Sequence, residues 1–267
     1  MMNRLIFNIR VFSQGAALSY IALFHWLSPI TYTASKIAMP LAQILFFTFL
    51  GTFATGRDTV SFYVIGNAIQ IAAVSGIYGV TMSIGGDRWN GTLPYLFGTP
   101  ANRLSMFVGR ASIHLLDGML GVFIAFLWGV ILLGLDLSQT NLLALGLTIL
   151  VTTYSTSGLG LLMGCLSLIT AQVMFVNNAV YFLLLIFSGA NVQLNTLPAW
   201  MQAFSQALPL TRGIAAARAL IAGGDLQAVA PLLLGELAIG TLYGFLGYRL
   251  FRWFEIQAKR RGTLETV

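Results

Sequence analysis

Three ionisable side chains interrupt one long apolar stretch at spacings that place them on one face of a helix. They are Arg110, His114 and Asp117, at positions i, i+4 and i+7. Asp117 lies about 13 residues into the stretch, roughly 20 Å of helix. Charged groups at such a depth in a bilayer are costly and are functional candidates. Asp117 needs a partner, and His114 is one turn away, so two interpretations stay open: a polar clamp between helices, or a pathway for substrate or protons.

Other polar residues occur more sparsely in the apolar stretches. Glu236 lies in the middle of the last stretch without a charged neighbour in sequence, so a partner helix or an added proton must neutralise it. Two further stretches carry amide side chains, Asn67 and Gln70 in one and Asn177 and Asn178 in the other. These amides are candidates to line a translocation path, and equally candidates for hydrogen bonds between helices.

Motifs for catalysis and for cofactor binding do not occur in the sequence. It contains no GxxxxGK[ST] for nucleotide phosphates, no HExxH and no GxSxG. The lone Cys165 cannot form an internal disulfide, and His25 and His114 are too few for a histidine-rich metal site. We therefore expect no catalytic residue, metal or cofactor in this chain, which is not an enzyme. Energy for uphill transport would come from another subunit.

The composition is that of a membrane protein. Of 267 residues, 57% are hydrophobic and only 8% are charged, whereas soluble domains carry about 25% charged residues. This excludes an ordinary soluble globule and a disordered chain. The formal charge is +6, but no basic patch is interleaved with aromatic residues, so no nucleic-acid partner is expected.

The apolar stretches predict an all-α membrane protein with six transmembrane helices, because a crossing needs about 20 apolar residues. The stretches cover residues 30–53, 60–85, 104–133, 141–166, 171–190 and 228–248. They define a transmembrane domain over 30–252 and a tail over 253–267. An even number of spans places both termini on one side, and most Lys and Arg residues then share that side. The positive-inside rule makes it the cytoplasm.

The N-terminal residues 1–29 have an amphipathic pattern. Apolar side chains recur on one helical face at Leu5, Ile9, Phe12 and Ala16. The pattern predicts an interfacial helix in the inner leaflet. A cytosolic tail that happens to be apolar is the alternative.

Two connections between spans are long. Residues 86–103 are expected to form a short cytoplasmic helix that Thr92 caps and Gly98 ends, with Asn102 capping the next span. Its apolar face either rests on lipid or docks a partner, and the turns on both sides favour docking. Residues 191–227, on the outer side, are broken by prolines and glycines. They predict a re-entrant or interfacial helix pair, with one more full span as the alternative.

These features together resemble the permease subunit of type-2 ABC transporters, the ABC-2 exporter-like family. The most specific likeness is Asp87-Arg88-Trp89-Asn90-Gly91-Thr92-Leu93, followed by Pro94-Tyr95-Leu96 and Thr99-Pro100. It is similar to the family's acidic-basic-acidic-x-Gly-Thr-Leu pattern and the Thr-Pro after it. Leu208-Pro209-Leu210-Thr211-Arg212 resembles the family's Pro-Leu-Thr stretch. Trp89 stands where the family usually has a second acid, and Pro94 where a Glu often follows Leu.

The resemblance implies that residues 86–103 are a coupling helix that docks into a groove of an ABC ATPase subunit. The implied docking residues are Asp87, Arg88, Trp89, Asn90, Thr92, Leu93, Leu96, Thr99 and Pro100. It also implies a multi-pass protein of the cell membrane that works as two permeases, a second copy or a paralogue, with two ATPases that bind ATP and Mg. The less acidic motif indicates a differently charged groove or one half of a heteromeric pair.

The favoured function is therefore export of an amphipathic substrate, such as a drug, antibiotic, peptide or lipid-like molecule. Spans 60–85 and 171–190 would rearrange around a path at the permease dimer interface. Changing Leu93 or Leu96 to Asp should then uncouple transport. The alternatives are a secondary transporter driven by protons through His114, Asp117 and Glu236, and an immunity or scaffold protein that moves nothing. The halves show no inverted repeat, which weakens the first alternative.

Overall fold

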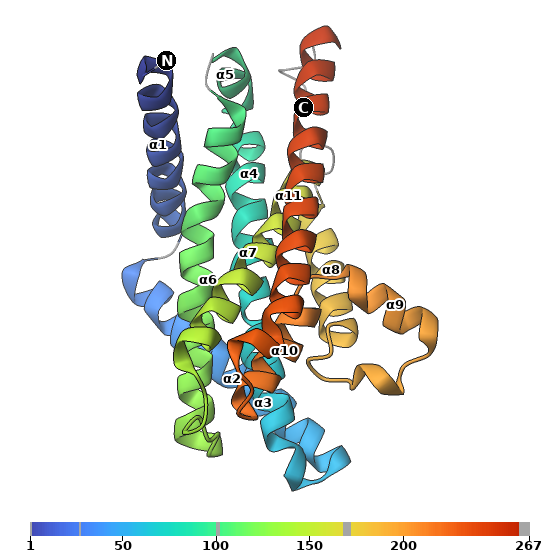
Figure 1. The fold of residues 1–267 in the computed structure, drawn as a ribbon. Helices are drawn as coiled ribbons and strands as arrows, with labels where there is room; N and C mark the ends of the chain where they lie inside the picture. Colours follow the sequence, from blue (N-terminus) through green and yellow to red (C-terminus); the bar gives the residue numbers. More distant parts are fainter. Residues whose placement is uncertain (1, 27, 100–101, 168–171, 262–267) are drawn as a thin grey trace.

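The computed structural model describes residues 2–26, 28–99, 102–167 and 172–261, and every regular element in that part of the chain is a helix (Figure 1). In chain order they are α1 (Met2–Trp26), α2 (Pro29–Thr55), η1 (Arg57–Thr59), α3 (Val60–Gln70), η2 (Val74–Gly79), α4 (Val80–Trp89), α5 (Leu93–Gly98), α6 (Arg103–Leu133), α7 (Leu142–Leu166), α8 (Val173–Phe187), η3 (Leu194–Thr196), α9 (Ala199–Ala207), α10 (Thr211–Ile221) and α11 (Leu226–Arg261). The two ends of the chain lie at the same end of the bundle as α5 (Figure 1).

Five segments are long and apolar enough to cross a membrane. They are Pro29–Thr55, Arg57–Asp87, Arg103–Leu133, Leu142–Leu166 and Leu226–Gln257, and they match five of the six expected spans. The remaining expected span, 171–190, corresponds to α8, an apolar helix of 15 residues. At 1.5 Å per residue α8 is about 22 Å long, which is less than the ~30 Å hydrocarbon core. The multi-pass, all-helical fold is confirmed, and the sixth crossing stays a prediction.

Polar caps fix where the long helices begin. Ser28 accepts a hydrogen bond from the backbone N–H of Thr31, and Pro29 fills the first helical position of α2. The Asn102 side chain accepts from Leu104 and Ser105, as the sequence predicts for this cap. Asn141 caps α7 in the same way, accepting from the backbone N–H groups of Leu143 and Ala144, each at 3.1 Å.

Asn141→Ala is expected to lower the free energy of unfolding by about 1 kcal/mol, because two N–H groups at the start of α7 lose their acceptor. Thermal unfolding in detergent, followed by circular dichroism, measures the change. Asn141→Asp keeps a cap acceptor and is the matched control. An alanine variant as stable as the wild type would show that water replaces this cap.

The centre of the bundle is α7, whose core-facing residues are small. Glycines bring its backbone against two neighbours: a Cβ at Gly160 would collide with the carbonyl oxygen of Gly76 in η2, and one at Gly158 with that of Gly240 in α11. Close approach through small residues is how membrane helices gain packing contacts without a hydrophobic driving force. The run GLGLLMG is therefore part of a packing seam, as the sequence indicates.

The second expected span contains an irregularity that the sequence analysis missed. Between α3 and α4 the chain forms the π-helix η2, which widens one turn of an otherwise continuous path. Such wide turns are rare and are frequently found at functional sites. Ser75 and Gly79 of this turn both contact the polar cluster described below.

The expected N-terminal helix is present as α1, and it packs along α6. The two backbones approach closely, because a Cβ at Gly109 would collide with the Phe12 carbonyl oxygen and one at Gly15 would lie 3.3 Å from that of Met106. Ile9 and Phe12, two residues of the expected apolar stripe, are exposed. Helix α1 runs along α6 and not across it (Figure 1), so the structure lends no support to the interfacial location, which stays a prediction.

The connection over residues 191–227 contains the two expected short helices, α9 (Ala199–Ala207) and α10 (Thr211–Ile221) (Figure 1). Helix α10 packs on α7 and α11 through an apolar cluster of Ala144, Ala216, Leu220, Val229 and Leu233. Arg218 of α10 reaches α3, where it donates to the carbonyl oxygen of Phe62 at 2.9 Å and lies 3.6 Å from the centre of the Phe62 ring. Arg218 thus joins α10 to α3, a packing role that the positive-inside rule does not predict.

Candidate functional site

The segment of residues 87–93, which resembles the family motif, is tied to α6 through its first residue, Asp87. Asp87 of α4 forms an ion pair with Arg110, and Arg110 also donates to the carbonyl oxygen of Ser83 at 2.9 Å. The Thr92 hydroxyl donates to the Asp87 carboxylate at 3.1 Å, and the Thr92 N–H donates to the Asp87 carbonyl oxygen at 2.8 Å. Asp87 therefore closes the turn before α5 and fastens it to α6.

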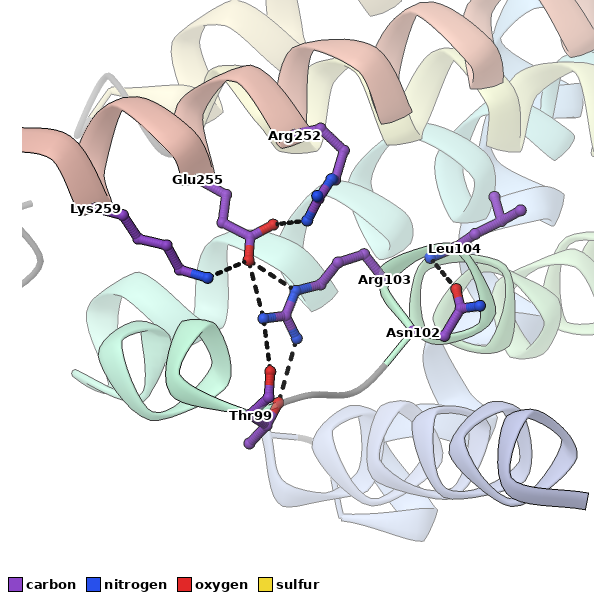
Figure 2. Close-up of polar contacts among 7 residues, drawn as sticks. All are labelled: Thr99, Asn102, Arg103, Leu104, Arg252, Glu255 and Lys259. Atoms are coloured by element: carbon purple, nitrogen blue, oxygen red, sulfur yellow. Dashed lines mark hydrogen bonds and ion pairs between the residues drawn. The ribbon is translucent and has the colours of Figure 1, made fainter. Parts of the chain in front are cut away.

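The other end of α5 is fastened to α11 (Figure 2). Arg103 donates to one carboxylate oxygen of Glu255, from Nε at 3.0 Å and from Nη2 at 2.9 Å. The same guanidinium donates to the carbonyl oxygen of Thr99 at 3.0 Å and to its hydroxyl at 3.2 Å. Arg252 and Lys259, on the same helix as Glu255, pair with its carboxylate as well. Both members of the Arg103–Glu255 pair are buried.

Helix α5 is thus a short element whose flanking residues, Asp87 and Thr99, are both held by residues of ion pairs. Tyr95 is 78% exposed on its surface, and Asn90 and Thr99 beside it are exposed. The side chains of Arg88, Trp89, Leu93 and Leu96 lie outside the described part of the structure, as does Pro100 altogether. A protruding aromatic residue on an element with fixed ends suits the docking of a partner.

A second polar cluster surrounds Asp117 inside the bundle, and its partners are not the expected one. Lys36 of α2 pairs with the carboxylate at 2.6 Å, and Tyr32 and Ser75 donate to it too. The Lys36 ammonium also donates to Ser75 Oγ at 3.1 Å. The expected pairing of Asp117 with His114 is therefore wrong. A lysine 81 residues earlier in the chain meets the carboxylate instead.

His114 is buried next to this cluster, and neither ring nitrogen has a hydrogen-bond partner among the described residues. Its ring lies against Gly79 of η2, where a Cβ would collide with Nδ1. Arg110, the third member of the expected stripe, belongs to the Asp87 pair instead. The residues of this helical face thus belong to two separate clusters. Arg110 holds the turn before α5, and Asp117 holds α2 and η2 to α6.

Glu236 is fully buried and binds the outer insertion. One of its carboxylate oxygens accepts from the backbone N–H of Leu210 at 2.7 Å. Leu210 has a φ of 76°, a left-handed conformation that non-glycine residues rarely adopt, and it immediately precedes α10. A carboxylate at a helix N-terminus is stabilised by the helix dipole. The Pro-Leu-Thr stretch thus supplies the N–H group that Glu236 binds.

The four amides of the expected path lie on two helices: Asn67 and Gln70 of α3 contact the segment just after α8, and Asn177 and Asn178 lie in α8 itself. Asn67 donates to Asn191 at 2.8 Å, Gln70 accepts from Ser188 at 3.1 Å, and Asn178 accepts from Tyr78 at 2.6 Å. Asn177 is buried, with neither amide atom bonded among the described residues. The Asn67 oxygen and the Gln70 nitrogen are likewise left over. The amides therefore join helices and still have spare hydrogen-bonding capacity.

Two members of these clusters could have been found from the sequence. Lys36 is the only charge of its stretch, which marks it as a partner for a buried acid elsewhere. Glu255 is the single acid between Arg249 and Arg261, a segment that otherwise carries only basic charges. The described residues hold no group of three or more His, Cys, Asp or Glu side chains that could bind a metal ion.

The long apolar helices of the described residues define a multi-pass membrane protein. The chain matches the family model described as ABC-2 type transporter over residues 22–222. It belongs to this ABC-2 type transporter family, whose members are permease components without ATPase activity of their own and whose membership implies ABC ATPase partners. No curated protein matches the chain.

Proposed function

We propose that this chain is the transmembrane subunit of an ATP-driven exporter, with α5 as the coupling helix on which a separate ATPase acts. The observation that carries the proposal is the attachment of α5: the Asp87–Arg110 pair holds one end and the Thr99–Arg103–Glu255 contacts hold the other. A helix that is fixed at both ends transmits a push to the helices that hold it. Both termini and α5 then lie in the cytoplasm, with ATP and Mg bound by two ATPase subunits.

The substrate path of the proposal follows the seam between η2 and α8, at the contact with a second permease copy or paralogue. Asn178 is exposed on this face and bonds Tyr78, and Tyr181 beside it bonds Gln43 at 3.0 Å. An exposed amide is costly against lipid, so another subunit or a hydrated path is the favoured neighbour. Mixed aromatic and amide groups suit an amphipathic substrate, such as a drug, antibiotic, peptide or lipid-like molecule.

A proton-driven mechanism has less support. Asp117 is paired with Lys36, and Glu236 binds the segment before α10, so the two acids belong to separate clusters. A scaffold or immunity function would leave substrate flux at zero while binding persists.

The proposal predicts that an ABC ATPase co-purifies with the chain expressed in its native membrane, and that Tyr95→Asp lowers the recovered ATPase at least about tenfold. A buried aromatic anchor commonly contributes 2 kcal/mol or more at an interface, and tenfold is about 1.4 kcal/mol. Quantitative mass spectrometry of the purified complex measures the ratio.

The matched control is Trp200→Asp, which places the same charge at an exposed aromatic residue of α9 (65% exposed) and should leave the ratio unchanged. Unchanged ATPase recovery in Tyr95→Asp would contradict docking at α5. Proton-driven flux in membranes stripped of ATPase would favour the alternative.

A further inference from the structure

Helix α11 carries two buried carboxylates near its opposite ends, and each holds a different segment. Glu255 holds α5 through Arg103, and Glu236 holds the start of α10. We propose that α11, packed on α7, is a lever that transmits the displacement of α5 to the outer insertion α9–α10. This inference rests on the proposed function, because it presumes that an ATPase displaces α5.

The inner attachment is the guanidinium of Arg103, the first residue of α6, which contacts two other segments. Arg103 binds Thr99, one residue beyond α5, and Glu255 of α11 at the same time (Figure 2). Both charged groups are buried, so separating them leaves an unpaired buried charge, which is strongly unfavourable. Arg252 and Lys259 contact Glu255 from within α11 and therefore do not join elements.

The outer attachment joins α11 to α10. Glu236 binds the Leu210 N–H, and the backbone of Gly235 next to it lies close to Arg212, since a Cβ there would be 2.7 Å from Arg212 Cδ. The apolar cluster around Leu220 and Val229 continues this contact along α10. Nineteen residues separate the two glutamates (255 − 236 = 19), about 28 Å of helix.

Between the two carboxylates α11 is packed backbone to backbone on α7. A Cβ at Gly240 would lie 2.5 Å from Ser155 Cα, and one at Gly247 would lie 2.8 Å from the Leu162 nitrogen. The Cys165 thiol donates to the Gly247 carbonyl oxygen at 3.0 Å. Helices in such close contact do not slide past each other without a large loss of packing. The pair therefore moves as one body.

The contact on the other side of the insertion must give way when this body moves. Arg218 holds α10 to α3 through the Phe62 carbonyl oxygen and ring. On the side of α11 the insertion has the apolar cluster and Glu236. On the side of α3 it has Arg218, which bonds Phe62, and the apolar residues Ile214 and Ala217, which share a core cluster with Val64 and Ile65 of α3. We therefore expect the lever to shift α10 relative to α3 and to loosen the contact between them.

The test measures two distances by pulsed electron spin resonance in the full complex with its co-purified ATPase, with one labelled permease in each complex. Asp58→Cys, at the exposed outer end before α3, is the reference. Gln227→Cys reports on α11 and Ala215→Cys on α10; both positions are exposed. Cys165→Ala removes the buried native thiol. In the wild type, the distance from position 58 to position 227 and the distance from position 58 to position 215 are both expected to change when ATP and vanadate are added.

Glu255→Gln is expected to lose both changes while ATP hydrolysis continues, and the exchange Arg103→Glu with Glu255→Arg is expected to restore them. Glu236→Leu should lose only the change at Ala215, whereas Glu236→Gln keeps an acceptor for Leu210 and should retain it. Arg249→Gln, an exposed base on α11, is the matched control. If the two glutamates only stabilised the fold, their variants would lose ATP hydrolysis and the distance changes together.

The inference is overturned if the wild type shows no ATP-dependent change at Gln227, or if Glu255→Gln keeps both changes. Loss of both changes in Glu236→Leu also contradicts it, because the inner attachment is intact there. The absence of any ATPase in the purified complex would instead overturn the proposed function, so the two failures are distinguishable.

Discussion

Lys36→Met is expected to lower the free energy of unfolding by about 3–5 kcal/mol, the usual cost of removing one partner from a buried ion pair. The Asp117 carboxylate would keep only its hydroxyl donors, Ser75 and Tyr32, at a depth where water is scarce. Side-chain exposure is 16% for Lys36 and 8% for Asp117, so solvent cannot replace the ammonium. Thermal or denaturant unfolding in detergent measures the loss.

The double variant Lys36→Met with Asp117→Leu decides between the two interpretations of this cluster. If the pair is a clamp, apolar residues of similar volume recover most of the stability, and ATP hydrolysis in the complex stays coupled to substrate. If the pair belongs to a pathway, stability returns but substrate no longer stimulates hydrolysis. Lys259→Met, which removes a half-exposed lysine at the end of α11, should cost less than about 1 kcal/mol.

Asp87→Ala is expected to have the largest functional effect of any single change near α5. It leaves the buried Arg110 guanidinium with the Ser83 carbonyl oxygen and takes a carboxylate acceptor from Thr92. The loss of stability is expected to be about 3 kcal/mol, and ATP hydrolysis in the complex should no longer respond to substrate. Unfolding in detergent and ATPase assays of the purified complex measure the two effects.

A second variant separates stability from docking. Asp87→Ala with Arg110→Leu removes both charges, so it should regain stability, yet the turn before α5 stays unfastened from α6 and coupling should stay lost. Asp58→Ala, which removes an exposed acid before α3 at the far end of the bundle, is the control and should change neither quantity. Normal coupling in the double variant would show that the Asp87–Arg110 pair does not position α5.

Local signals in the sequence were sufficient to place most helices. Caps such as Asn102 and Asn141, and the proline at position 29, act on adjacent residues, so their effect can be read without the fold. The outer helices followed from the proline and glycine breaks. The length of α8 was not predictable in this way, because residues 171–190 carry no charge and hydropathy alone does not mark where the helix ends.

The polar clusters were predictable only in part. Spacing within one helix identified Arg110, His114 and Asp117, because neighbours at i+3 and i+4 share a face. Their partners come from other helices: Asp87 lies 23 residues before Arg110 and Lys36 lies 81 residues before Asp117. Such pairings depend on how helices pack, which a periodic pattern does not encode. The role of Glu255 was not predicted, because the basic residues around it are those expected at the cytoplasmic end of a transmembrane helix.

The wide turn of η2 affects how the two halves of the second span are oriented and where the span can bend. One extra residue in a turn changes the direction in which the side chains after it point. Both halves of the span pack on α6. Helix α3 also contacts Arg218 of α10 and Asn191, whereas α4 contacts α1 through Ser83 and Ser19. Wide turns are also recognised points of bending in long helices. The second span therefore contains a bending point in its middle that does not depend on proline. We expect its two halves, α3 and α4, to be able to change their relative direction there.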